Sequence, residues 1–127
     1  PSLVGSEMCI RDRFRAMQLA AATALEAEAD WYEGNNENYR NRRHLAGEIM
    51  KTLGCTYDEK QVGMFLWGKI PASCKDVEEL TEKVLHEARV FITPGFIFGS
   101  NGARYIRISL CCKDNKLAEA LERIKRI

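Results

Sequence analysis

Arg107, in the word YIRIS at residues 105–109, is the residue whose type and place most clearly suggest chemistry. Ile106, Ile108 and Leu110 recur at every second position, which places them on one face of a strand and Arg107 on the other. A guanidinium in mid-strand needs an acceptor, and its planar fork matches a carboxylate bidentately. Arg107 is therefore a candidate anion ligand. The alternative is a guanidinium that simply reaches water, and spacing alone favours that alternative.

The stretch around Arg107, residues 90–110, reads as two strands joined by a turn. An apolar strand at 90–93 precedes Pro94-Gly95, and a glycine-bearing loop closed by Asn101-Gly102 leads into a second strand at 104–110. The loop at 96–102 is a candidate wall for a ligand cleft, although aromatic residues in so short a loop also serve as simple packing.

Several words of the sequence carry a family resemblance: MQLAAATAL (17–25), YRNRR (39–43), GMFLWGKIP (63–71), TPG (93–95), FG (98–99) and YIRIS (105–109). In this order they resemble the C-terminal part of class I/II aminotransferases, fold-type I enzymes that use pyridoxal phosphate. The resemblance covers residues 14–127. It implies that Arg107 binds the α-carboxylate of an amino-acid substrate, whose amino group is passed to a 2-oxo acid. It also implies a homodimer in the intact enzyme.

The residues that would hold the cofactor are not found in this sequence. In this family a Schiff-base lysine stands in a Ser-rich word that would come just before Phe14, and none of the eight lysines lies in such a word. The family's pyridinium aspartate, stacking aromatic and phosphate donors are expected farther upstream. We therefore predict no catalytic and no cofactor-binding residue here, poor binding of pyridoxal phosphate, and no transaminase activity for the isolated chain.

Residues 1–13, PSLVGSEMCIRDR, do not fit the pattern of the rest of the chain. The segment begins with proline, shows no sustained helical or strand period, and resembles a translated adapter sequence; a flexible native leader is the alternative. We expect residues 1–13 to be a non-native or disordered leader. Residues 14–127 are then expected to form the small C-terminal domain of an aminotransferase, with the large cofactor-binding domain mostly absent.

Composition limits the partners. The formal net charge is +1, from 19 basic and 18 acidic residues, which argues against a nucleic-acid or membrane surface as the main partner. The five cysteines form no C-x-x-C pair and the two histidines have no suitably spaced cysteine, so we expect reduced thiols, no metal site and a cytoplasmic protein. Cys111 and Cys112 are adjacent, and a disulfide between neighbours would be strained.

The remaining periodicities predict an α+β fold in the order α-α-β-α-β-β-α, with helices packed on a small, mainly antiparallel sheet. Gly34-Asn35-Asn36 is expected to separate the first two helices, with an Asn capping the second. Asp76 with Glu79 predicts a capped helix start. Trp67 is expected to bury its ring and give its N–H an acceptor. The predicted helices are 14–28, 37–53, 76–88 and 114–126, and the predicted strands 62–70, 90–93 and 104–110.

A second function is also compatible with these residues. A stand-alone amino-acid-binding or regulatory α+β module could use Arg107 without catalysis, and it would bind amino acids in the absence of pyridoxal phosphate. A transcription regulator would need a DNA-binding segment. An RNA-binding domain would need exposed aromatic pairs with a strong basic excess, which this composition lacks.

Overall fold

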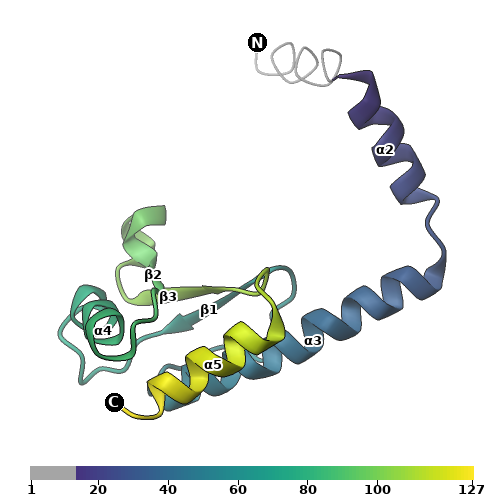
Figure 1. Cartoon of the computed structure of the whole chain (residues 1–127). Helices are drawn as coiled ribbons and strands as arrows, with labels where there is room; N and C mark the ends of the chain where they lie inside the picture. Colours follow the sequence, from purple (N-terminus) through teal and green to yellow (C-terminus); the bar gives the residue numbers. More distant parts are fainter. Residues whose placement is uncertain (1–13) are drawn as a thin grey trace, which may run out of the picture. The chain divides into compact units, whose positions relative to one another are not determined.

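The computed structural model describes residues 14–127 (Figure 1). The chain divides into two compact units, Pro1–Asn36 and Glu37–Ile127. The leader expected at residues 1–13 lies outside the described residues, and the expected domain boundary at residue 14 stays a prediction. Within residues 14–127, no helix is long and apolar enough to cross a membrane.

The described residues of the first unit contain two helical segments. Helix α2 spans Arg15–Leu25, and α3 spans Ala29–Thr52 and so continues into the second unit. The hydroxyl of Tyr32 donates a hydrogen bond to the carbonyl of Ala24 at 2.6 Å, which ties the start of α3 to the end of α2. The break predicted at Gly34-Asn35-Asn36 is wrong, because α3 continues through all three residues. A glycine costs a helix only about 1 kcal/mol, and each residue added to an existing helix gains a hydrogen bond.

The second unit is built on a three-stranded antiparallel sheet in the order β1-β3-β2. The strands are β1 (Phe65–Lys69), β2 (Thr93–Pro94) and β3 (Tyr105–Ser109). The predicted strand at 90–93 is wrong except for its last residue. Val90 follows Arg89, which takes the left-handed conformation (φ 57°) and turns the chain, so pairing begins only at Thr93. Pro94 lacks an N–H and ends the strand.

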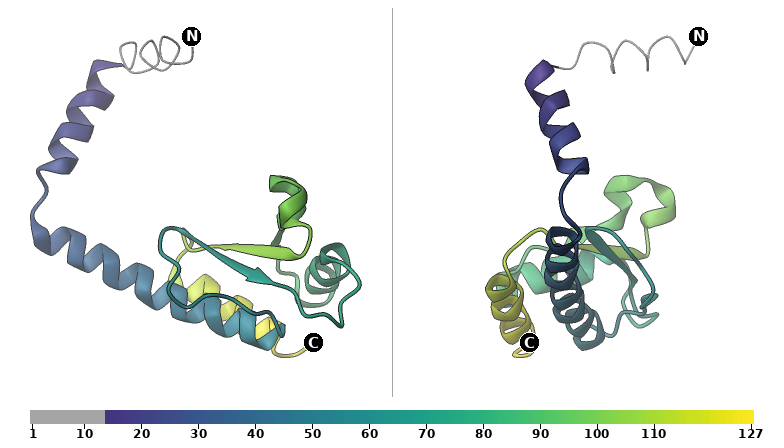
Figure 2. Two further views of the ribbon diagram at one scale, coloured as in Figure 1. Left: turned by 180° about the vertical axis from the view of Figure 1, so that it is seen from behind. Right: turned by 90° about the vertical axis from the view of Figure 1, so that its right-hand side faces the viewer.

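Helix α4 (Val77–Lys83) begins as predicted at Asp76, whose carboxylate accepts the backbone N–H of Glu79 at 2.9 Å. The Glu79 carboxylate accepts the N–H of Lys75 rather than that of Asp76, also at 2.9 Å. A π-helical turn η1 (Val84–Ala88) continues α4, and the last helix is α5 (Asp114–Ile124). The second half of α3 and α5 lie side by side on one face of the sheet (Figures 1 and 2).

The core lies between that sheet face and the helices. Ile106 and Leu110 are fully buried and Ile108 is 8% exposed, which confirms the predicted alternation in β3. They pack in one cluster with residues of β1, α3 and α5, among them Leu66, Met50 and Leu117. The predicted α+β fold with a mainly antiparallel sheet is confirmed. The opposite face of the sheet, which carries Arg107, is where a site can form.

Candidate functional site

Arg107 lies at the centre of the sheet, in the middle of the central strand. It is paired with Trp67 of β1 on one side and with Thr93 of β2 on the other. Its guanidinium carbon is 4.2 Å from the ring centre of Phe65 and 4.1 Å from that of Phe98. Contacts of a cation with a ring are worth about 0.5–2 kcal/mol each, depending on exposure. We call Arg107, Phe65 and Phe98 the arginine clamp.

Each ring of the arginine clamp is placed by a different element. Phe65 begins β1 two residues before Trp67, so both side chains fall on the Arg107 face. Phe98 ends the 3₁₀ turn η2 (Gly95–Phe98), which is followed by a second turn, η3 (Ser100–Gly102). The Phe98 ring also meets Trp67 edge to face, with 5.5 Å between ring centres.

The edge strand β1 is held by the side chain of Gln61. Its amide donates to the carbonyl of Trp67 at 2.8 Å and accepts the N–H of Trp67 at 3.0 Å, as a neighbouring strand would. Arg43 of α3 in turn donates to the carbonyls of Gln61 and of Gly63, the latter at 2.8 Å. The cross-strand pair of Trp67 and Arg107 is therefore connected to α3 through Gln61 and Arg43.

Four arginines in residues 14–127 are partly buried, and three of them have acceptors. Arg42 bonds Asp114 at 2.6 Å, an interaction that raises the pKa of Arg42. Arg43 bonds two carbonyls, and Arg104 bonds the carbonyls of Pro71, Cys74 and Lys75. Arg107 differs from them, because its Nε is buried and has no hydrogen-bond partner within the described chain.

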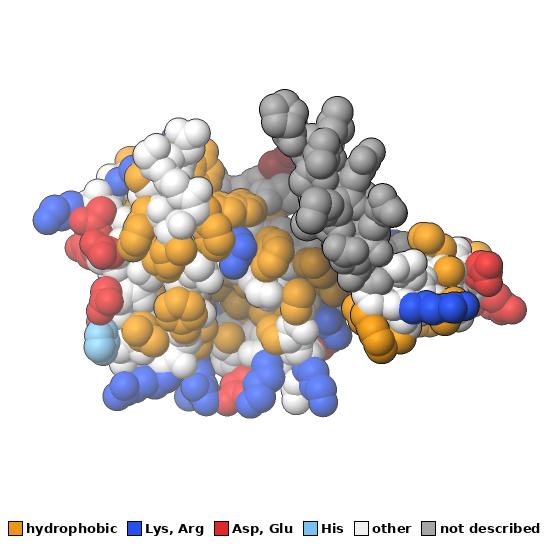
Figure 3. All heavy atoms as spheres, turned by 90° about the horizontal axis from the view of Figure 1, so that it is seen from above, with side chains coloured by type: hydrophobic (Ala, Val, Ile, Leu, Met, Phe, Trp, Pro, Cys, Tyr) orange, Lys and Arg blue, Asp and Glu red, His pale blue; other side chains and the backbone are white. Residues whose placement is uncertain are grey.

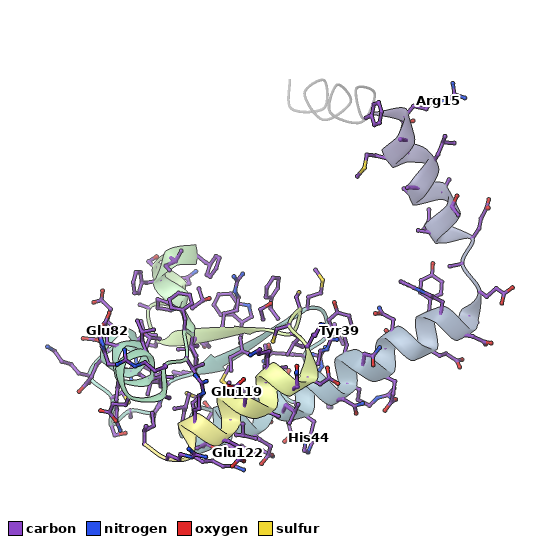
Figure 4. The ribbon with its side chains drawn as sticks, viewed as in Figure 1. Arg15, Tyr39, His44, Glu82, Glu119 and Glu122 are labelled. Carbon is purple, nitrogen blue, oxygen red and sulfur yellow. The ribbon has the colours of Figure 1, made fainter. Side chains whose placement is uncertain are left out.

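Several acidic side chains of the second unit are engaged elsewhere. Glu82 pairs with His86, and Glu119 with Lys116 and Arg123. Figure 4 shows Glu82 on α4 and Glu122 on α5, each pointing outward from its helix. Among residues 14–127, no carboxylate forms an ion pair with Arg107. The internal Asp or Glu partner that would have argued against an anion-binding role is therefore not found in this part of the chain.

The arginine clamp favours approach of an acceptor along the edge of the guanidinium. The Phe65 and Phe98 rings lie against the guanidinium, with its carbon 4.2 and 4.1 Å from their centres, and its N–H groups lie in one plane at its edge. A carboxylate accepts from such an edge through two parallel hydrogen bonds. A buried N–H without a partner costs about 1–3 kcal/mol, which an incoming anion would recover. The geometry suits a single planar carboxylate.

The surroundings of the arginine clamp are apolar. Hydrophobic side chains gather on this face of the sheet and on the turn above it (Figure 3), and Phe96 and Ile97 of η2 are exposed. Next to Phe98 lies an open hollow of about 470 Å³ lined by Trp67, Phe98, Asn101, Gly102 and Tyr105. Trp67 is only partly buried, and no hydrogen bond of its ring N–H is formed within residues 14–127. The predicted burial of this ring is therefore wrong, because α5 and the second half of α3 cover the other face of the sheet.

The described residues do not fit pyridoxal phosphate. A Schiff-base lysine must be made neutral, usually by burial or by a nearby cation. All eight lysines are exposed, and the hydrogen bond to Glu48 raises the pKa of Lys51, which is the opposite direction. Residues 14–127 also contain no group of three or more His, Cys, Asp or Glu side chains placed to hold a metal ion. What they offer is a place for a carboxylate.

Phe65 and Phe98 are the site residues that sequence reasoning missed. The signal for Phe65 was present, because it lies two residues from Trp67 and so on the face of the sheet that carries Arg107. Phe98 belongs to the loop 96–102, which was expected as a cleft wall, but its contact with Arg107 depends on the fold of the turn and is not visible in the spacing.

Known proteins provide an independent comparison. The model of the family described as aminotransferase class I and II matches residues 3–124, and so reaches into the segment 1–13. The chain is 36% identical over 112 residues to an LL-diaminopimelate aminotransferase of Desulforudis audaxviator, which covers 88% of this chain and 28% of that protein. It is 31% identical over 115 residues to transaminase BacF of Bacillus subtilis, and the match covers 90% of this chain and 29% of BacF.

Solved structures agree in fold. An aromatic aminotransferase from Pyrococcus horikoshii superposes with a TM-score of 0.73 at 33% identity, covering 86% of this chain and 30% of that one. Substrate-bound BacF from Bacillus subtilis superposes with a TM-score of 0.72 at 32% identity, covering 89% of this chain and 29% of that one. The chain thus spans less than a third of the length of the curated relatives that it matches.

Proposed function

Because this chain belongs to the class I and II aminotransferase family, we propose that Arg107 binds the α-carboxylate of an amino-acid substrate in an enzyme that passes the amino group to a 2-oxo acid. The observation that carries the proposal is the state of Arg107. It packs against the rings of Phe65 and Phe98, and its buried Nε has no acceptor within residues 14–127. Among the partly buried arginines of residues 14–127, Arg107 is the one whose guanidinium makes no hydrogen bond within the described chain.

The residues of this chain would bind and orient the substrate rather than carry out the chemistry. Two parallel hydrogen bonds to the guanidinium would fix the plane of the carboxylate, and with it the direction of the substrate amine. The apolar residues around the clamp would keep water from the bound carboxylate and strengthen the ion pair. Members of this family depend on pyridoxal phosphate. Because the described lysines do not fit that cofactor, we place the cofactor residues outside these 127.

The substrate is proposed only as an α-amino acid. The matched relatives act on LL-diaminopimelate and on aromatic amino acids, and all such substrates share the α-carboxylate that Arg107 would bind. The homodimer and the cytoplasmic location stay predictions. The lack of transaminase activity in the isolated chain is also still a prediction. If that chain formed a 2-oxo acid from any amino acid, the prediction would be contradicted.

The test compares Arg107→Ala and Arg107→Lys in the full-length enzyme. Losing one partner of a desolvated ion pair costs about 2–4 kcal/mol, so we expect Arg107→Ala to lower kcat/KM for an amino acid by roughly 30- to 1000-fold. Arg107→Lys should recover only part of the lost kcat/KM, because a lysine cannot bind a carboxylate through two parallel hydrogen bonds. Arg123→Ala is the matched control, since Arg123 is exposed and pairs with Glu119 on its own helix.

A second substrate separates binding from folding. The amine that corresponds to the amino acid without its carboxylate should react poorly with the wild type and equally poorly with Arg107→Ala. An equal fold loss on both substrates would mean that Arg107 maintains the structure rather than binding the carboxylate. A loss below threefold on the amino acid would also refute the proposal.

A further inference from the structure

Two adjacent thiols, Cys111 and Cys112, lie in the connection between β3 and α5. Both are free and exposed, and no hydrogen bond to either sulfur is formed within residues 14–127. Cys55 is buried and Cys74 partly buried, so they are less accessible than this pair. Consecutive Cα atoms are about 3.8 Å apart, so rotation of the two exposed side chains can bring both sulfurs to one bridging atom.

The chain around this pair is fixed on both sides. Arg42 donates to the carbonyl of Leu110 at 3.3 Å and to the carboxylate of Asp114 at 2.6 Å, the residues just before and two after the pair. The backbone N–H of Cys111 donates to the hydroxyl of Ser109 at 3.3 Å. A dithiol held at both ends loses little backbone freedom when it is bridged.

Cys112 also faces a defined space. It lines a cavity of about 270 Å³ whose walls include Ile49, Ile92, Leu117 and the stem of Lys116. An apolar group carried by a bridging atom could enter this cavity, while the bridging atom stays at the surface with the two sulfurs. Thr93 and Arg107 of the sheet also line this cavity, and it shares no lining residue with the hollow beside Phe98.

We propose that Cys111 and Cys112 form a chelating dithiol site for trivalent arsenicals that carry an apolar substituent. With an organic arsenic oxide, two S–H bonds break, two As–S bonds form, and the oxygen leaves as water with both protons. No atom changes its oxidation state. The single bridging atom lengthens the ring and so avoids the strained geometry of a disulfide between neighbours. The site does not depend on the proposed transaminase function.

Both thiols are needed for tight binding. After the first As–S bond forms, the second thiol acts at an effective concentration set by its neighbour, which commonly strengthens binding by roughly 10²–10⁴-fold. Replacing either cysteine by serine should therefore weaken binding by a factor on the order of 10²–10⁴. Replacing Cys74, the partly buried thiol whose charge interacts with that of Cys55, should leave binding unchanged.

The experiment treats the full-length protein with an equimolar amount of phenylarsine oxide and then with iodoacetamide. Trypsin cuts after Arg107 and Lys113, so residues 108–113, ISLCCK, carry both thiols in one peptide. We expect both cysteines to be protected together, to remain protected in excess 2-mercaptoethanol, and to be released by dimercaptopropanol. Cys111→Ser and Cys112→Ser should each leave the remaining thiol fully alkylated, and Cys74→Ser should behave as wild type.

Three results would overturn the proposal. The first is protection of Cys112 that survives Cys111→Ser. The second is release by the monothiol, which would show a single As–S bond. The third is loss of protection in Cys74→Ser, which would place the site at Cys55 and Cys74.

Discussion

Gly95 is predicted to hold the arginine clamp together, and Gly95→Ala tests this. Gly95 begins the turn η2 that ends at Phe98, and it packs backbone to backbone against the end of η3. A Cβ at Gly95 would lie 2.5 Å from the carbonyl oxygen of Gly102 and 2.6 Å from that of Tyr105. Both are main-chain atoms, so neither can rotate away as a flexible side chain would.

The energetic penalty can be worked from these distances. Restoring ordinary contact requires the two oxygens to retreat from 2.5–2.6 Å to at least 3.4 Å, and overpacking of this kind costs about 1–3 kcal/mol. The turn is the movable partner, because Tyr105 is in the central strand. Displacing it would also remove the Phe98 ring from Arg107, a further loss of about 0.5–1 kcal/mol. We expect Gly95→Ala to lower the free energy of unfolding by about 1.5–4 kcal/mol.

Urea denaturation measures this change, and tryptophan emission reports on the clamp because Trp67 meets Phe98 edge to face. A Trp31→Phe background leaves Trp67 as the fluorophore of this chain. Gly34→Ala is the control, since a Cβ there meets no atom within 4 Å and Gly34 lies inside α3. It should raise stability by up to about 1 kcal/mol. An unchanged urea midpoint and emission for Gly95→Ala would refute the reasoning.

Two further predictions concern stability. Arg89→Gly should raise the free energy of unfolding by about 1 kcal/mol, because Arg89 is non-glycine at φ 57°; a lower urea midpoint would contradict this. Burial raises the pKa of the Cys55 thiol from 9.0 to about 11. Because this thiol ionises at a lower pH in the unfolded chain than in the folded one, the free energy of unfolding should fall as the pH rises. The fall should be about 2–3 kcal/mol between pH 9 and 11. Cys55→Ala should remove that fall; an identical pH slope in both proteins would contradict it.

How much the sequence reveals differs between the two faces of the sheet. The buried face was predicted correctly, since Ile106, Ile108 and Leu110 alternate strictly and all lie in the core. Burial imposes this period directly on the sequence. On the open face Trp67 was predicted wrongly, because neither its exposure nor its neighbours follow from strand period. Phe65 and Phe98 come together only through the turn between Gly95 and Gly102, a tertiary contact that leaves no periodic signal.

The predicted boundaries of helices and strands were wrong where the local conformational preference was weak compared with the effect of neighbouring structure. Gly34-Asn35-Asn36 has poor helix propensity, yet α3 passes through it as part of a 24-residue helix. The apolar run at 90–92 looks like a strand but lines a cavity beside α5 instead. Asp76, in contrast, was predicted correctly, because capping is a local interaction between residues three apart.

The position of Arg107 couples the candidate site to the core through one strand. Of the three strands in the described chain, β3 is paired on both edges, so the backbone of Arg107 is held by Trp67 and Thr93. The residues on either side of Arg107 in the sequence, Ile106 and Ile108, point into the core. They fix the position of the Arg107 backbone and the direction in which its side chain leaves the sheet. Protein interiors resist small displacements because they are close-packed. A carboxylate bound at Arg107 would thus be positioned by the packing of the whole second unit, which suits a residue whose proposed task is to orient a substrate.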